Sequence, residues 1–206
     1  MGRLPAAWDH FELATAAARE AADHCLLAFA AGEQAYVLLD LGQPADALAK
    51  VRAVYDKAHV GVPHQIRGWL LAAQGEMAAA TGDETSCRRA LDLATGEVSH
   101  GPSGEDLPYL ALSAVHMAHW RGNCLTRFGD PETVTELTTA LARMDGSFTR
   151  AEAGLRSDLA AALHATGERA EARGHLARAS ELAKLTGSAR QRRRIAELAR
   201  WIGRAA

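Results

Sequence analysis

The feature that most constrains this chain is a fourfold internal repeat. Four segments each contain a helical stretch, a turn of glycine and polar residues, and a second helical stretch. The turns are centred on Gly42, Gly82, Gly129 and Gly167, at intervals of 40, 47 and 38 residues. Self-similarity at such a period is typical of chains that build one supersecondary unit per repeat and stack the units. The repeat therefore predicts an array of about four helical hairpins.

Compact residues recur at fixed distances from each turn glycine. Seven residues before the glycine stand Ala35, Gly75, Gly122 and Ala160. Five residues after it stand Ala47, Cys87, Val134 and Ala172. Nine residues after it stand Val51, Leu91, Thr138 and Leu176. Twelve residues after it stand Val54, Ala94, Leu141 and Ala179. We expect the two helices of each hairpin to approach closely at the small residues and to fill the remaining space with one larger side chain. The glycine suits the end of a helix, where the backbone turns left-handed.

The composition supports the same fold class. Hydrophobic residues make up 48% of the 206 residues but aromatic residues only 5%, and 45 Ala and 25 Leu stand against 11 Val and Ile together. Ala and Leu are strong helix formers, whereas strands favour branched and aromatic side chains. The composition therefore excludes a β-rich protein and predicts an all-α fold, and the length suits one domain over residues 1–206.

Both ends are expected to carry capping helices, because each repeat of an array leaves an apolar face uncovered. The segment 8–24 reads as one helix within an N-terminal cap of residues 1–24. The four hairpins occupy residues 25–188, and an apolar stripe in residues 189–206 predicts a C-terminal cap. That stripe consists of Ile195, Leu198, Trp201 and Ile202. The connector 96–108 is the longest stretch without a helical pattern, and it is either functional or a plain insertion.

The hairpin pattern resembles the tetratricopeptide repeat over about residues 25–190, although the units are longer than the usual 34 residues. This resemblance implies a right-handed superhelix. Four stretches resemble a narrower group more closely: FAAGEQAYVLLDLGQPADALA, YLALSAVHMAHWRGNCLTRFGDPE, FTRAEAGLRSDLAAALHATGE and GSARQRRRIAEL. They are similar to the C-terminal repeat region of actinobacterial helix-turn-helix transcriptional regulators of the Xre type. In that family a DNA-binding domain precedes a repeat domain that senses a ligand or partner. No such domain precedes the repeats here, so no direct DNA binding is expected from this chain alone.

The first helices of such hairpins line a concave groove, which makes their inward residues candidate ligand contacts. In the third unit, His116, His119, Asn123 and Arg127 fall on one helix face. The guanidinium group of Arg127 could bind a carboxylate or phosphate through two parallel hydrogen bonds. A solvated convex face would have the same spacing, so both interpretations stay open.

An acidic and aromatic wall is expected opposite this stripe. Asp40 and Glu76 supply charge, while Tyr36 and Trp69, with Phe29, supply aromatic surface. A groove of this composition suits a peptide or an amphipathic small-molecule effector. The alternative for Trp69 and Phe29 is ordinary packing within the hairpins.

Catalytic, metal and cofactor sites are not indicated. The chain has no glycine-rich phosphate loop and no nucleophile elbow, so it is interpreted as a non-enzyme without a cofactor. His116 and His119 are three residues apart rather than four, and the three cysteines form no CxxC pair, so no metal site is predicted. A less favoured alternative is a small-molecule enzyme with His116 or His164 as general base.

Charge is unevenly distributed. The net charge is −2, but residues 143–206 hold 13 Lys and Arg against 7 Asp and Glu. The run RQRRR is interpreted as a solvated cap, not a nucleic-acid site, and it could pair with the acidic half of another copy in a homodimer. The longest apolar run, residues 25–31, is far short of the roughly 20 residues needed to span a membrane. A cytoplasmic protein without membrane association is expected.

Together these features predict a regulatory sensor or interaction module that binds a peptide, a protein or a small effector. The alternative is a constitutive protein adaptor or dimerisation scaffold that has no ligand.

Overall fold

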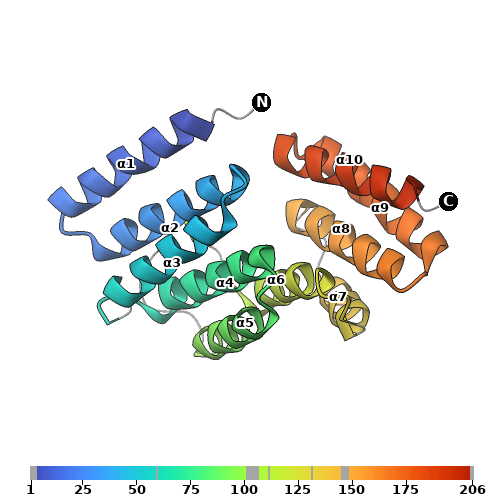
Figure 1. Ribbon diagram of the computed structural model, residues 1–206, viewed down its shortest axis with the longest axis horizontal. Coiled ribbons are helices and arrows are strands. Elements are labelled where there is room, and N and C mark those ends of the chain that lie inside the picture. Colours follow the sequence, from blue (N-terminus) through green and yellow to red (C-terminus); the bar gives the residue numbers. More distant parts are fainter. Residues whose placement is uncertain are drawn as a thin grey trace. The chain divides into compact units, whose positions relative to one another are not determined.

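The computed structural model describes residues 4–58, 60–100, 107–110, 112–130, 132–144 and 149–204. Within these ranges the backbone forms ten α-helices and no strand, so the predicted all-α class is confirmed (Figure 1). The helices are α1 (Leu4–Glu20), α2 (His24–Asp40), α3 (Pro44–Ala58), α4 (His64–Thr81), α5 (Glu84–Val98), α6 (Ala114–Thr126), α7 (Glu132–Ala142), α8 (Thr149–Ala165), α9 (Arg169–Leu185) and α10 (Ala189–Arg204). None of these helices is both long enough and apolar enough to cross a membrane.

The helices group into two compact units. The N-terminal unit covers residues 2–117 and the C-terminal unit residues 118–206, with the boundary inside α6. In the N-terminal unit each helix from α1 to α5 packs against the next, and α2 also contacts α4 (Figure 1). In the C-terminal unit α7 packs on α8, α8 on α9, and α10 on both α8 and α9. The assignment of the whole chain to one domain stays a prediction.

The turns between paired helices have the predicted glycine geometry. Gly42, Gly82, Gly129 and Gly167 all have φ between 69° and 93°. This left-handed region is one that other residues rarely adopt, so each glycine ends its helix and reverses the chain. Gly187, with φ 66°, makes a fifth such turn between α9 and α10.

Close helix approach at the small residues is also confirmed. Ala35 and Ala160 are fully buried. A Cβ added at Gly75 would lie 2.9 Å from Leu91, and one added at Gly122 would overlap Leu137. Glycine is thus required where the large side chain of the second helix meets the backbone of the first.

The third hairpin departs from the predicted register by one residue. Val134, Thr138 and Leu141 were expected to pack against the first helix, but the buried residues of α7 are Thr133, Leu137 and Ala140. That part of the prediction is wrong. The Asp130 carboxylate accepts from the backbone N–H of Glu132, two residues on, whereas Asp83 in the preceding hairpin accepts from Ser86, three residues on. The tighter cap accompanies a rotation of α7 by one residue.

Both capping helices are present, and α1 differs from its expected bounds. It ends at Glu20, not at residue 24, because Ala22 has φ 54° and Asp23 caps α2 by accepting from Leu26 N–H at 2.9 Å. At the other end, Ile195 and Ile202 of α10 are buried as predicted, while Trp201 is 43% exposed. The expected connector 96–108 begins later than predicted, because α5 continues to Val98, and its residues 101–106 lie outside the described residues.

Candidate functional site

An aromatic cluster joins α2, α4 and the segment before α6 in the N-terminal unit. The ring centroids of Phe29 and Trp69 are 4.8 Å apart, as are those of Phe29 and Tyr109. Trp69 is only 4% exposed, and its ring fills the space beside Gly32, where an added Cβ would come within 2.5 Å of it. The burial of Trp69 shows that its ring packs α4 against α2. Its role as a ligand contact stays a prediction.

Polar side chains lie beside this cluster at equivalent repeat positions. Tyr36 and Glu76 each stand six residues before a turn glycine, and the Tyr36 hydroxyl donates to Glu76 Oε2 at 3.2 Å. Asp40 is exposed at the end of α2. The structure therefore brings Tyr36 and Glu76 together on the face that α2 and α4 share, which we call the α2/α4 face.

The predicted polar stripe of α6 has a different environment at each residue. His116 Nδ1 lies 2.8 Å from Ser113 Oγ, and Arg127 is exposed. In the C-terminal unit, His119 Nε2 lies 2.8 Å from Asp158 Oδ2, and Asn123 Oδ1 accepts from Arg194 Nη2 at 2.7 Å. His119 and Asn123 thus contact partners within their own chain.

Asp158 is the centre of this arrangement, which we call the Asp158 cluster: Asp158 of α8, His119 and Asn123 of α6, and Arg194 of α10. Asp158 is fully buried and also accepts from Arg194. Burial alone would raise the pKa of its carboxyl group, but the nearby Arg194 and His119 outweigh burial and lower that pKa. A charged carboxylate is tolerated in the interior because its partners replace the lost water.

Sequence reasoning missed Asp158 and placed Arg194 in a solvated tail. One signal was available: Asp158 is the single charged residue in the stretch SDLAAALHA. A lone carboxylate in an apolar stretch of a helix needs a partner where that stretch is buried. Arg194 directly precedes Ile195 of the apolar stripe, where its guanidinium can reach α8.

His164, the alternative general base, lies beneath the C-terminal cap. It is 9% exposed, and its ring meets Trp201 edge-on with centroids 4.3 Å apart. Covered by α10, its imidazole packs in the interior and does not open onto a site.

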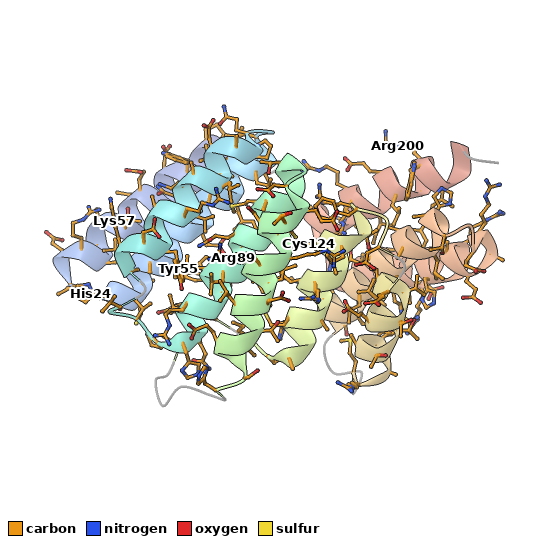
Figure 2. The ribbon with its side chains drawn as sticks, turned by 60° about the horizontal axis from the view of Figure 1, so that its bottom comes forward. His24, Tyr55, Lys57, Arg89, Cys124 and Arg200 are labelled. Atoms are coloured by element: carbon orange, nitrogen blue, oxygen red, sulfur yellow. The ribbon has the colours of Figure 1, made fainter. Side chains whose placement is uncertain are left out.

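The described residues form neither a disulfide bond nor a group of side chains that could hold a metal ion. Cys87 and Cys124 are buried and Cys25 is half-buried, and none of the three forms a disulfide bond; Cys124 belongs to α6 (Figure 2). No group of three His, Cys, Asp or Glu side chains in the described ranges converges to hold a metal ion.

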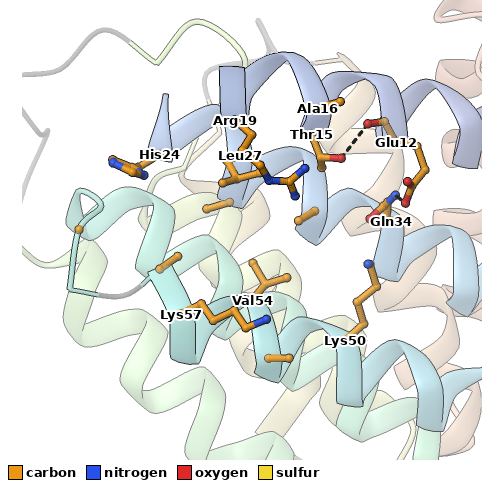
Figure 3. Close-up of a pocket in the computed structure, with 15 residues that line it drawn as sticks. Glu12, Thr15, Ala16, Arg19, His24, Leu27, Gln34, Lys50, Val54 and Lys57 are labelled. Atoms are coloured by element: carbon orange, nitrogen blue, oxygen red, sulfur yellow. Dashed lines mark hydrogen bonds between the residues drawn. The ribbon is translucent and has the colours of Figure 1, made fainter. Parts of the chain in front are cut away.

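A cleft that the sequence did not indicate lies between α1, α2 and α3 of the N-terminal unit. Its volume is about 580 Å³ (Figure 3). We call it the α1/α3 cleft. The residues that line it are Glu12, Thr15, Ala16, Arg19, His24, Leu27, Ala28, Ala31, Gln34, Lys50, Ala53, Val54, Lys57, Ala58 and Gly61. None of the predicted ligand contacts is among them.

The polar groups of the α1/α3 cleft are partly ordered. Gln34 is 2% exposed and donates from Nε2 to Glu12 Oε1 at 2.7 Å. The Lys50 ammonium lies 5.2 Å from the centre of the Trp8 ring. Burial lowers the pKa of Lys50, Glu12 opposes that effect, and Lys57 adds to it.

Comparison with known proteins identifies the fold. No family model matches the chain, and no curated protein sequence matches it. Among solved structures, the chain is similar to a putative kinesin light chain protein of Podosopora anserina with nearly identical TPR-like repeats. The match has a TM-score of 0.57, 18% identity, and covers 91% of this chain and 90% of that one. A single-residue variant of that protein matches with a TM-score of 0.59 and 17% identity, at the same coverage. The chain therefore has a TPR-like helical repeat fold.

Proposed function

We propose that this chain is a protein-interaction module that binds a peptide segment of a partner protein on the α2/α4 face. The hydrogen bond between Tyr36 and Glu76 carries this proposal. It joins equivalent positions of two consecutive repeats and orders a polar surface over a rigid aromatic base. Stacked helical repeats use such surfaces, formed by their first helices, to bind extended ligands.

The chemistry of the α2/α4 face favours a basic peptide. Glu76 and Asp40 contribute negative charge, and Tyr36 offers an aromatic ring beside it. An arginine side chain of a partner can stack on an aromatic ring and pair with a carboxylate at the same time. Aromatic rings are also rigid, so they contribute contact area with little loss of side-chain entropy on binding.

A regulatory role belongs to the same proposal. The resemblance of four stretches to the repeat region of Xre-type regulators supports a sensory module of a transcriptional regulator, in which peptide binding is passed to a DNA-binding partner. Exposed Arg127 is a proposed contact for an acidic group of the ligand or partner. His116, His119 and Asn123 are proposed to position the surrounding surface through the contacts described above.

The test is binding to a library of fluorescent decapeptides in which net charge and aromatic content vary independently. We expect basic peptides to bind and charge reversal in Glu76→Lys to weaken binding at least tenfold. Glu84→Lys is the matched control, because Glu84 is exposed at the start of α5 and lies outside this face. Equal peptide binding by the native chain and Glu76→Lys would overturn the proposal.

A further inference from the structure

The α1/α3 cleft and the α2/α4 face use different sides of α2. The cleft takes His24, Leu27, Ala28, Ala31 and Gln34 from this helix. The contacts with α4 come from Gly32 and Tyr36, which lie on another side at helical spacing. Any ligand of the cleft is therefore separate from a peptide on the α2/α4 face.

The interior of the cleft is aliphatic. Leu27 and Ala31 of α2 are half-buried, and Val54 and Ala58 of α3 face the same space. None of the described lining residues is Phe, Trp or Tyr. Small aliphatic residues leave a channel suited to a flexible hydrocarbon chain, and the volume falls in the range of small-molecule sites.

The rim of the cleft is cationic. Arg19 of α1 and Lys57 of α3 approach it from opposite sides, and Lys50 extends from α3 toward Gln34 (Figure 3). Among the described lining residues Glu12 is the only acid, and Gln34 donates to its carboxylate. Throughout the described ranges, neither Arg19 nor Lys57 forms an ion pair with an acid. The fold thus places three cationic side chains, Arg19, Lys50 and Lys57, around an aliphatic channel whose described lining contains one acidic residue.

From this arrangement we propose that the α1/α3 cleft binds a medium-chain aliphatic carboxylate. The carboxylate lies between Arg19 and Lys57, and the hydrocarbon chain lies over Leu27, Ala31 and Val54. Binding an anion would relieve the repulsion between the cations, and burying the chain would remove apolar surface from water. This inference goes beyond the proposed peptide function and does not depend on it.

The first experiment is calorimetric titration of the full chain with hexanoate, octanoate and decanoate below their micelle concentrations. If the chain enters the cleft, affinity rises about fourfold for each added methylene. Decanol has the same chain length without the negative charge, and acetate has the carboxylate without the long hydrocarbon chain. Both are expected to bind at least tenfold more weakly than decanoate. Affinity that is independent of chain length, decanol that binds as tightly as decanoate, or no measurable heat with decanoate would overturn the proposal.

The second experiment uses variants. Arg19→Glu combined with Lys57→Glu is expected to reduce decanoate affinity at least tenfold. Arg89→Glu is the matched control, since Arg89 is exposed on α5 and does not line the cleft (Figure 2). If the double variant does not fold, Ala53→Trp provides a second test, because Ala53 is exposed on the lining and a larger side chain there fills the channel. Unchanged decanoate binding in the folded variants would overturn the proposal.

Two further outcomes separate the alternatives. An acidic peptide that binds the cleft more tightly than decanoate would replace the fatty carboxylate as the occupant and overturn this inference. Glu76→Lys is expected to leave decanoate binding unchanged, so failure of the peptide proposal and failure of this one are distinguishable.

Discussion

The two capping helices of this chain use charge in opposite ways. In the C-terminal unit, α10 sends Arg194 to the fully buried Asp158, and Gln191 donates to the backbone carbonyl of Arg150 at 2.7 Å. In the N-terminal unit, α1 packs on α2 through Ala18 and Thr15 and leaves Arg19 at the edge of an open cleft.

This difference separates charges that stabilise the fold from charges available to a ligand. In the Asp158 cluster, polar side chains from three helices pair with one another in the interior. Loss of one of them therefore leaves another charge without its partner. The cations of the α1/α3 cleft stand near solvent and near one another, so the fold gains little from them. We therefore expect large stability effects at the C-terminal cap and small ones at the cleft.

The largest effect is expected for Asp158→Ala. It removes the carboxylate that compensates Arg194 and His119 and should lower the free energy of unfolding by about 3 kcal/mol, near the lower limit for breaking a buried pair. The lower limit applies because the Arg194 side chain is 42% exposed and can turn to water. Urea denaturation measures the change. Glu197→Ala, at an exposed ion pair of 3.9 Å on α10, should change stability by less than about 0.5 kcal/mol. Equal effects of the two variants would remove the distinction between the caps.

Gly154→Ala tests the same cluster through its packing. A Cβ at this position would lie 2.7 Å from His119 Cε1, so the imidazole must move away from Asp158. We expect a loss of about 1 to 3 kcal/mol. Gly174→Ala in α9 is the control, because its added Cβ meets nothing within 4 Å and should stabilise the helix by up to about 1 kcal/mol. A stabilising Gly154→Ala would show that the position of His119 is unimportant.

Lowering the pH should reduce the free energy of unfolding of the native chain more than it reduces that of the Asp158→Asn variant. Because the pKa of Asp158 is lowered in the folded state, its contribution is present above the unfolded pKa of about 3.9 and is lost as pH falls through the lower folded value. The stability difference between the native chain and Asp158→Asn should therefore shrink below about pH 4. Urea unfolding across this range measures it, and a difference that stays constant with pH would contradict the assignment.

The smallest effect is expected for Lys50→Met at the cleft. Burial already disfavours the Lys50 ammonium, so loss of its charge offsets loss of its contact with the Trp8 ring. The free energy of unfolding should stay within about 0.5 kcal/mol of the native value by urea denaturation. A loss of about 2 kcal/mol, well above the range of ordinary surface substitutions, would place Lys50 among the structural charges and weaken the contrast with Asp158.

Much of the fold was predictable because its signals are local. The turn glycines and the small residues at Gly75 and Gly122 follow from backbone conformation and helix spacing, which neighbouring residues largely decide. The rotation of α7 by one residue was not predictable, because Thr138 and Leu137 are both compatible with the hairpin pattern. The choice depends on the cap at Asp130 and on which side chain fits against Gly122.

The candidate sites were only partly predictable. Tyr36 and Glu76 share a repeat position, so the repeat register alone predicts that they lie near each other. The α1/α3 cleft had no such signal, because a cavity is a property of how three helices fail to close and not of any one of them. Asp40 and Arg127 are exposed, and their roles stay predictions.

The amino-acid sequence by itself determined the helices, their turns and their pairing into hairpins, because periodicity and glycine conformation act over a few residues. Only the tertiary structure decided which charged side chains form ion pairs within the chain. Asp158 meets Arg194 36 residues later in the chain, while Arg19 and Lys57 form no ion pair with an acid among the described residues. That outcome depends on the distances between side chains from separate helices, which sequence spacing does not specify.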